Sequence, residues 1–161
     1  MRAWVGYGGT FDPVHCGHLA IAAAVHDALG APVALVPAAD PPHKDAPHAD
    51  ASHRRRMLEI AVAGERGLRA APRELGRDGP SYTVETLLGV RRELGPDVPV
   101  IWTVGADSLA QLHRWHRWRE LFALAHVLAV GRPGFPLDPA GLAEIDPALA
   151  DRGAVGMLAA S

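Results

Sequence analysis

Apolar runs alternate along the chain with stretches in which apolar residues recur at helical spacing. The apolar runs predict strands over residues 3–7, 32–36, 68–71, 98–104 and 126–130. The stretches between them predict helices over 17–29, 53–63, 81–94, 107–112 and 117–124. Strands that alternate with helices are typical of a parallel sheet covered on both faces. We therefore expect an α/β fold: a Rossmann-like, doubly wound parallel sheet with helices on both faces.

Local sequence also predicts details of the second helix and of the last part of the chain. The Ser52 side chain can cap a helix from residue 53 to about 63. The inward positions of that helix are then Met57, Ile60 and Ala61. Residues 133–161 are richer in Pro, Gly and Ala, and we expect no strong element there.

Composition narrows the class of protein. The chain has 161 residues, of which 48% are hydrophobic and 21% charged, as expected for one globular domain with a sizeable core. A net charge of -2 argues against nucleic acid as a partner. The single cysteine, Cys16, excludes a disulfide within the chain. No apolar run suits a signal peptide or reaches the length of about 18 residues that a membrane span needs. We therefore expect a cytoplasmic protein without a membrane partner, and a homo-oligomer stays open.

The most informative motif follows the first predicted strand. Gly8 and Gly9 lack side chains, so a ligand can approach the backbone closely, and Thr10 and Phe11 lead on to the next helix. The N-terminus of that helix favours an anion. His15 and His18 are three positions apart and share one face of the starting helix. Two imidazoles at this place can donate to a phosphoryl oxygen where negative charge develops.

Other interpretations of this motif differ in strength. The dinucleotide fingerprint that starts at Gly6 would need glycine at position 11, which is Phe11, and the other common phosphate loop, G-x-x-x-x-G-K-[ST], is absent. The histidines can also be polar caps of a helix, or a metal pair with Cys16 between them. Zinc is disfavoured because no second cysteine completes a tetrahedral set.

Two further motifs lie in the loop after the second predicted strand and at the start of the third predicted helix. His43 and Lys44 stand in a proline-rich loop after the second strand, where Lys44 can neutralise phosphate charge or be an ordinary surface residue. Tyr82 and Thr83 begin the third helix, whose N-terminus can hold an anion. Plain helix capping by Ser81 or Thr83 explains the same residues.

The clearest predicted strand, 98–104, is followed by Gly105 and Asp107. Gly105 permits close approach of a ligand, and Asp107 can accept hydrogen bonds from ribose hydroxyls. Trp115 and Trp118 then alternate with arginine and histidine. This alternation suits a single-stranded nucleic-acid platform, stacking on a pyridine ring, or core packing. We expect one tryptophan to stack and the other to be structural.

The run from Gly8 to Leu19 resembles the signature of the HxGH nucleotidyltransferases, which are related to the class I aminoacyl-tRNA synthetases. It is most similar to the form found in the bacterial nicotinate-nucleotide adenylyltransferase family. Further matches to that family are Pro-Pro-His-Lys, Tyr-Thr-x-x-Thr-Leu, Gly-x-Asp followed by Trp, and Arg-Pro-Gly. The arginines of the His53–Leu58 stretch, which also resembles the family, are expected on a solvated or substrate-edge face.

The resemblance implies adenylyl transfer from ATP to nicotinate mononucleotide in NAD biosynthesis, with nicotinate adenine dinucleotide and pyrophosphate as products. It assigns catalysis to His15, His18 and Lys44. The implied ATP-binding residues are Gly8, Gly9, Thr10, Phe11, His15, His18, Gly105 and Asp107. The implied residues for nicotinate mononucleotide are His43, Lys44, Tyr82, Thr83, Trp115, His116 and Arg132. Mg²⁺ is expected on the ATP phosphates, with no metal ligands from the protein.

One family motif has no counterpart in this sequence. The family carries a late Ile-Ser-x-Thr-x-Ile-Arg string that binds ATP phosphates, whereas the resemblance here runs from Trp4 to about Gly134. We therefore expect residues 1–161 to form a single nucleotidyltransferase domain without that C-terminal ATP-binding segment. Two other functions stay open: a related adenylyl- or cytidylyltransferase with another phosphate acceptor, and a non-catalytic nucleotide-binding module.

Overall fold

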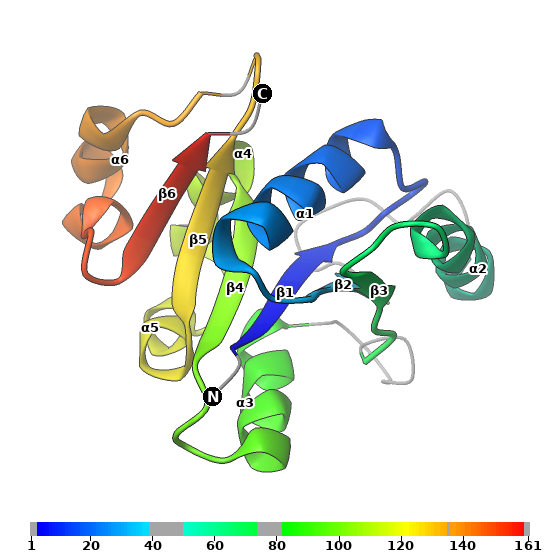
Figure 1. Cartoon of the computed structure of the whole chain (residues 1–161). Coiled ribbons are helices and arrows are strands. Elements are labelled where there is room, and N and C mark those ends of the chain that lie inside the picture. Colours follow the sequence, from blue (N-terminus) through cyan, green and yellow to red (C-terminus); the bar gives the residue numbers. More distant parts are fainter. Residues whose placement is uncertain (1–2, 39–49, 74–81, 135, 160–161) are drawn as a thin grey trace.

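A computed structural model of the chain describes residues 3–38, 50–73, 82–134 and 136–159. These residues contain six strands that form one sheet, in the order β3-β2-β1-β4-β5-β6, with every neighbouring pair parallel (Figure 1). The strands are β1 (Trp4–Gly9), β2 (Val33–Pro37), β3 (Leu68–Ala70), β4 (Val100–Gly105), β5 (His126–Gly131) and β6 (Val155–Ala159). The expected doubly wound α/β fold is therefore confirmed.

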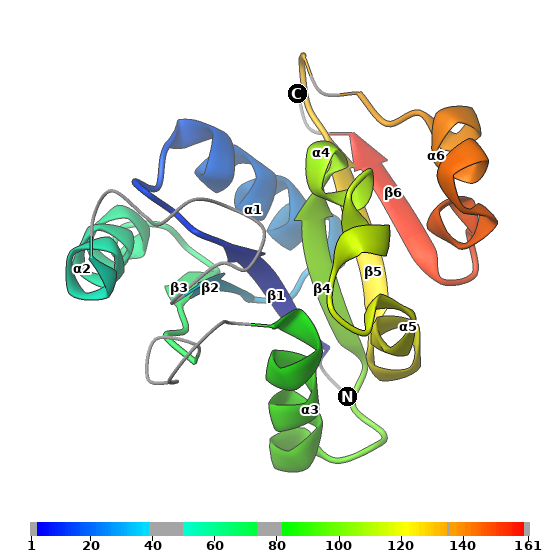
Figure 2. The same cartoon turned by 180° about the vertical axis from the view of Figure 1, so that it is seen from behind.

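Helices cover both faces of the sheet. On one face lie α1 (Cys16–Leu29) and α2 (Ala51–Val62), and on the other α3 (Thr83–Leu94), α4 (Ala106–Leu109) and α5 (Leu121–Leu124) (Figures 1 and 2). Three short 3-10 turns and one more helix complete the described chain: η1 (Leu112–Arg114), η2 (Trp118–Glu120), η3 (Pro147–Ala150) and α6 (Pro139–Ile145). The two helices predicted over 107–112 and 117–124 are thus each a short α-helix joined to a 3-10 turn. None of the described helices is long and apolar enough to cross a membrane.

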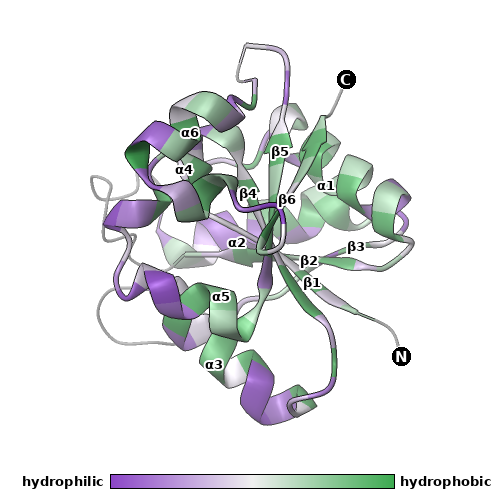
Figure 3. Ribbon diagram, turned by 90° about the vertical axis from the view of Figure 1, so that its left-hand side faces the viewer, coloured by the Kyte–Doolittle hydropathy of each residue, from purple (hydrophilic) through white to green (hydrophobic). Residues whose placement is uncertain are grey.

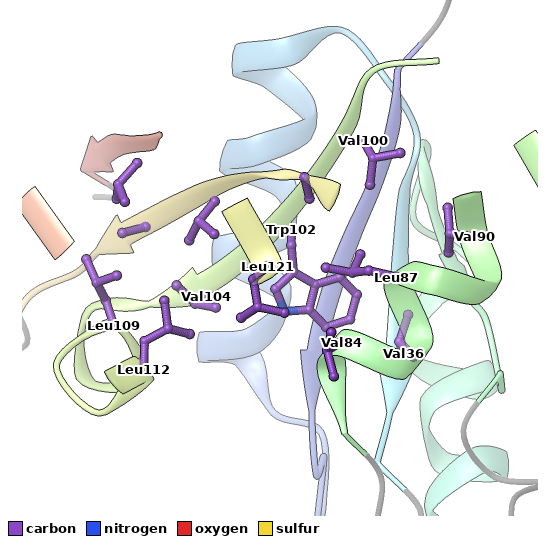
Figure 4. Close-up of a cluster of buried hydrophobic side chains, with 14 of the residues drawn as sticks. Val36, Val84, Leu87, Val90, Val100, Trp102, Val104, Leu109, Leu112 and Leu121 are labelled. Carbon is purple, nitrogen blue, oxygen red and sulfur yellow. The ribbon is translucent and has the colours of Figure 1, made fainter. Parts of the chain in front are cut away.

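The core divides into two apolar layers because side chains alternate between the faces of each strand. In β4, Val100, Trp102 and Val104 point to the face covered by α3, where Trp102 lies among Val84, Leu87 and Leu121 (Figure 4). The other layer joins residues of β1 and β2 to the inner faces of α1 and α2. Figure 3 shows the apolar strands between α1 on one side and α3 and α5 on the other.

Two glycines of β1 provide the space that the large Trp102 indole occupies. A Cβ added to Gly8 would lie 2.3 Å from Cζ2 of Trp102, and one added to Gly6 would lie 2.6 Å from the Trp4 ring. The two indoles stack, with ring centroids 6.4 Å apart. The sequence suggested that Gly8 lets a ligand approach the backbone, and the structure shows that the core also requires a glycine at this position.

The structure corrects the prediction for the second helix. Its cap is Asp50, whose Oδ1 accepts a hydrogen bond from the backbone N–H of His53 at 2.9 Å, so the helix begins before Ser52. The inward stripe is shifted as a result: Ile60 is 62% exposed. The buried positions of α2 are Arg54, Leu58 and Val62.

The last part of the chain contains structure that its composition does not suggest. Within 133–161, where we expected no strong element, α6 packs Leu142 into the core and β6 extends the sheet next to β5. The burial of β6 is mostly partial, with only Val155 fully buried. The strand β6 is a short apolar run, but its glycine and alanine are weak strand formers, so the composition did not indicate a strand.

Candidate functional site

The predicted site residues gather at the carboxyl edge of the sheet, where the strand order reverses. From β1 the chain proceeds outward through β2 and β3, and from β4 it proceeds in the opposite direction through β5 and β6. Ligands of open α/β sheets bind in the crevice at such a switch point. The loop after β1, the start of α4 after β4, and Arg132 directly after β5 all lie at this edge.

The two histidines cap the start of α1. His15 is the N-cap residue, and its Nδ1 accepts a hydrogen bond from the backbone N–H of Gly17 at 3.1 Å. In return, Nδ1 of His18 accepts from the backbone N–H of His15, also at 3.1 Å. A neutral imidazole whose Nδ1 is an acceptor carries its proton on Nε2. The capping box therefore favours the same tautomer in both rings, with the proton on the hydrogen-bond donor Nε2.

Aromatic packing holds the His18 ring in place. The rings of His15 and His18 stack with centroids 3.7 Å apart, and the edge of Phe11 meets His18 at 5.0 Å. Phe11 in turn meets Tyr7 edge to face at 5.6 Å. Phe11 is buried and has a φ of 50°, a backbone region that bulky residues rarely adopt unless the surrounding structure enforces it. The imidazole pair is thus the outer end of a packed aromatic row.

Gly17 and Arg132 meet beside this pair. A Cβ at Gly17 would lie 2.9 Å from Cε1 of His15 and 3.8 Å from Nη1 of Arg132. Glycine therefore lets the imidazole and the guanidinium approach the start of α1 together. The resemblance assigned Arg132 to nicotinate mononucleotide, and the structure places its positive charge next to the two histidines.

Tyr7 lies under the same edge and is sensitive to its charges. Burial, which is the largest cause, and the negative charge of Asp107 raise the pKa of the Tyr7 hydroxyl, the positive charge of Arg132 opposes them, and the net result is a pKa of about 12. An arginine and an aspartate of the site thus act with opposite sign on the same neutral phenol. Asp107 itself is exposed, and its Oδ1 lies 2.7 Å from where a Cβ of Gly105 would be.

The residues predicted for the pyridine nucleotide lie at the start of α3 and in the turn between η1 and η2. The rings of Tyr82 and His116 stack with centroids 4.3 Å apart. Trp115 and Trp118 are both half-buried and pack against the core, and Trp118 also meets Phe122 edge to face. The cap of α3 is Tyr82, without a side-chain hydrogen bond, so capping by Thr83 is wrong as an explanation of this motif.

The remaining predicted residues are placed as follows. His43, Lys44 and Ser81 lie outside the described residues. Gly9 and Thr10 follow each other at the end of β1, and the buried Thr10 hydroxyl has no hydrogen-bond partner among the residues that the structure describes. In that same part of the chain no group of three or more His, Cys, Asp or Glu side chains could hold a metal ion, which leaves the metal interpretation of His15, Cys16 and His18 without support.

One residue near the site was assigned wrongly from sequence. Arg54 was expected on a solvated or substrate-edge face, yet it is 1% exposed. Its Nη1 donates to the carbonyl oxygen of Thr10 at 3.0 Å and to that of Ala38 at 2.5 Å. Burial lowers the pKa of Arg54, while nearby carboxylates oppose that effect. Its spacing of four from Leu58 was the signal that could have identified it.

Comparison with known proteins gives consistent results. The cytidylyltransferase-like family matches residues 6–153. A protein of Xylella fastidiosa (strain M12) named probable nicotinate-nucleotide adenylyltransferase is 54% identical over 135 residues, which are 81% of this chain and 61% of that protein. A protein of the same name from Stenotrophomonas maltophilia (strain K279a) is 52% identical over 157 residues, 94% of this chain and 71% of that protein. The chain thus spans about three fifths of the length of the first relative.

A solved structure shares the fold. The nicotinic acid mononucleotide adenylyltransferase of Plasmodium falciparum, solved as a complex with NaAD, superposes with a TM-score of 0.76 at 16% identity and covers 99% of this chain and 75% of its own. At this identity the likeness concerns the fold alone. It agrees with the strand order described above.

Proposed function

The chain belongs to the cytidylyltransferase-like family, among the nicotinate-nucleotide adenylyltransferases, and from this premise we propose that it transfers an adenylyl group from ATP to nicotinate mononucleotide. The products are nicotinate adenine dinucleotide and pyrophosphate, a step of NAD biosynthesis. The observation that carries the proposal is the stacked His15–His18 pair at a helix start on the switch edge, where the capping hydrogen bonds place the proton of each ring on Nε2. The relatives support the choice of acceptor.

The chemistry requires alignment and charge neutralisation more than proton transfer. The phosphate of nicotinate mononucleotide is already a nucleophile, so it attacks the α-phosphorus of ATP in line with the departing pyrophosphate and needs no general base. His15 and His18 donate from Nε2 to phosphate oxygens, where charge builds up in the transition state. Arg132, beside Gly17, adds a positive charge at the same place. No covalent intermediate forms, and Cys16 has no part in the reaction.

The nucleotide substrate is the Mg²⁺ complex of ATP. We propose that the ion is held by the phosphates, as is usual for Mg²⁺, and neutralises part of their charge. Gly8, Gly9, Thr10 and Phe11 provide the backbone that faces these phosphates. The exposed carboxylate of Asp107, above Gly105, accepts hydrogen bonds from the ribose hydroxyls.

The acceptor binds at the neighbouring loops. We propose that Trp115 stacks on the nicotinate ring and that the backbone N–H of His116 holds its carboxylate, together with the start of α3 at Tyr82 and Thr83. The stacked rings of Tyr82 and His116 bring these two segments side by side. His43 and Lys44 belong to the same proposal on the strength of the sequence motif, with Lys44 neutralising phosphate charge.

A panel of substrates tests the proposal. ATP and CTP are each combined with nicotinate mononucleotide, nicotinamide mononucleotide and phosphopantetheine, and pyrophosphate release is measured. We expect the highest kcat/KM for ATP with nicotinate mononucleotide. A preference for CTP would replace the proposed donor, and a preference for phosphopantetheine would replace the proposed acceptor. Binding of ATP by calorimetry without any turnover would support a non-catalytic module instead.

A further inference from the structure

Arg54 is a buried charge on a helix face that otherwise packs apolar residues. It shares the inward stripe of α2 with Leu58 and Val62, and its side chain is 1% exposed. Removing a guanidinium from water is costly unless its N–H groups find good partners. Packing alone would favour an aliphatic residue here, so the reason for an arginine must lie in what it binds.

Among its partners are two backbone carbonyls at the edge of the site. Nη1 donates to Thr10, which follows β1, and to Ala38, which follows β2. The same two segments are joined directly, because the backbone N–H of Ala38 donates to the carbonyl oxygen of Gly9 at 2.8 Å. Arg54 therefore fixes the point at which the chain leaves the two strands. Asp12, in the loop toward α1, lies near enough for its carboxylate to favour the charged guanidinium.

We propose that Arg54 is a positioning residue for the phosphate-binding loop. It holds the carbonyl of Thr10, and so the orientation of the peptide groups from Gly9 to Phe11 that lead to the stacked histidines. The inference rests on the proposed function, since it assumes that this loop receives the ATP phosphates. Arg54 itself does not reach the substrate, because its guanidinium is enclosed beneath the loop.

A purely structural arginine and a positioning arginine differ in what their loss changes. If Arg54 only stabilised the fold, its replacement would lower the active fraction and reduce turnover with both substrates alike. If it positions the loop, the loss falls on ATP, because a displacement of about 1 Å in a reacting group can cost about 100-fold in rate. The KM and the dissociation constant of nicotinate mononucleotide would then change little.

The test compares Arg54→Met and Arg54→Lys with Arg56→Met, a matched control at an exposed position of the same helix. We expect Arg54→Met to lower kcat/KM for ATP about 100-fold and to weaken ATP binding in calorimetry, while the dissociation constant of nicotinate mononucleotide stays within about twofold. Arg54→Lys keeps the charge and one donor for a carbonyl, and should recover part of the loss. Arg56→Met should match the unaltered protein.

Each result decides the matter. Folded Arg54→Met protein with unchanged ATP affinity and kcat/KM would overturn the proposal, as would an equal rise in the dissociation constants of both nucleotides. If Arg54→Met does not fold, Arg54→Lys decides by the same comparison of the two dissociation constants. If the unaltered protein binds ATP but transfers nothing to nicotinate mononucleotide, the proposed function fails, and ATP affinity still tests the role of Arg54.

Discussion

Replacing His18 separates the two roles that its ring has in the structure. Nδ1 accepts from the backbone N–H of His15, and Nε2 is the group that we assign to the phosphates. His18→Ala removes both atoms. His18→Asn retains an acceptor, because Oδ1 can take the place of Nδ1, but it has no atom at the place of Nε2.

The expected magnitudes follow from these losses. A missing capping side chain typically costs about 1 kcal/mol, which for a domain of this size lowers Tm by about 2–4 °C. A missing preorganised donor typically lowers kcat by about 100- to 1000-fold. We therefore expect His18→Ala to show both effects. His18→Asn should show the full loss of kcat with most of the Tm retained.

The assay measures pyrophosphate release at saturating nicotinate mononucleotide, with thermal unfolding of the same samples. His126→Ala is the control, since His126 is exposed at the start of β5, on the opposite edge of the sheet from the site. If His18→Asn restored turnover along with Tm, the catalytic effect would depend on the cap. The assignment of Nε2 as a phosphate donor would then be refuted.

Three further predictions concern the core, the electrostatics and the acceptor. Gly8→Ala should lower the free energy of unfolding by about 1–3 kcal/mol, since its Cβ would overlap the Trp102 indole. Gly89→Ala, in the open middle of α3, should raise the free energy of unfolding by about 0.5–1 kcal/mol. Chemical denaturation measures both, and equal effects would contradict the packing argument. Because the pKa of Tyr7 is raised to about 12 in the folded state, its contribution to stability should be fully present below about pH 10 and be lost as the pH rises toward 12. Tyr7→Phe should reduce the fall in the free energy of unfolding between these two pH values, and an unchanged fall would refute the shift. Trp115→Ala should raise the KM of nicotinate mononucleotide more than that of ATP in steady-state kinetics, and an equal rise would end the stacking assignment.

The sequence predicted the strands and helices that have a clear local pattern of apolar residues. Strands β1 and β4 are apolar runs that end in glycine, and the structure confirms both strands. The residues that follow them lie together at one edge of the sheet, as the prediction of a site there requires. The sequence could not predict β6, because Val155–Ala159 is a short, partly exposed edge strand. It is stabilised as a strand by pairing with β5, and a local pattern does not show that pairing. Arg54 was missed because three consecutive arginines look alike until the cap at Asp50 fixes the helix phase and gives its spacing from Leu58 a meaning.

The same limit applies to the glycines of the first motif, and it changes how substitutions there should be interpreted. In β1 successive residues face opposite layers: a Cβ on Gly8 would strike Trp102, while one on Gly9 would lie 3.2 Å from the Phe11 ring in the other layer. Packing of the core therefore favours a glycine at both positions, whether or not a ligand is bound. A loss of activity in Gly8→Ala is then evidence for a phosphate contact only when folding is shown to be intact. A loss of activity in His18→Asn, which keeps an acceptor for the backbone N–H of His15, tests the chemistry more directly.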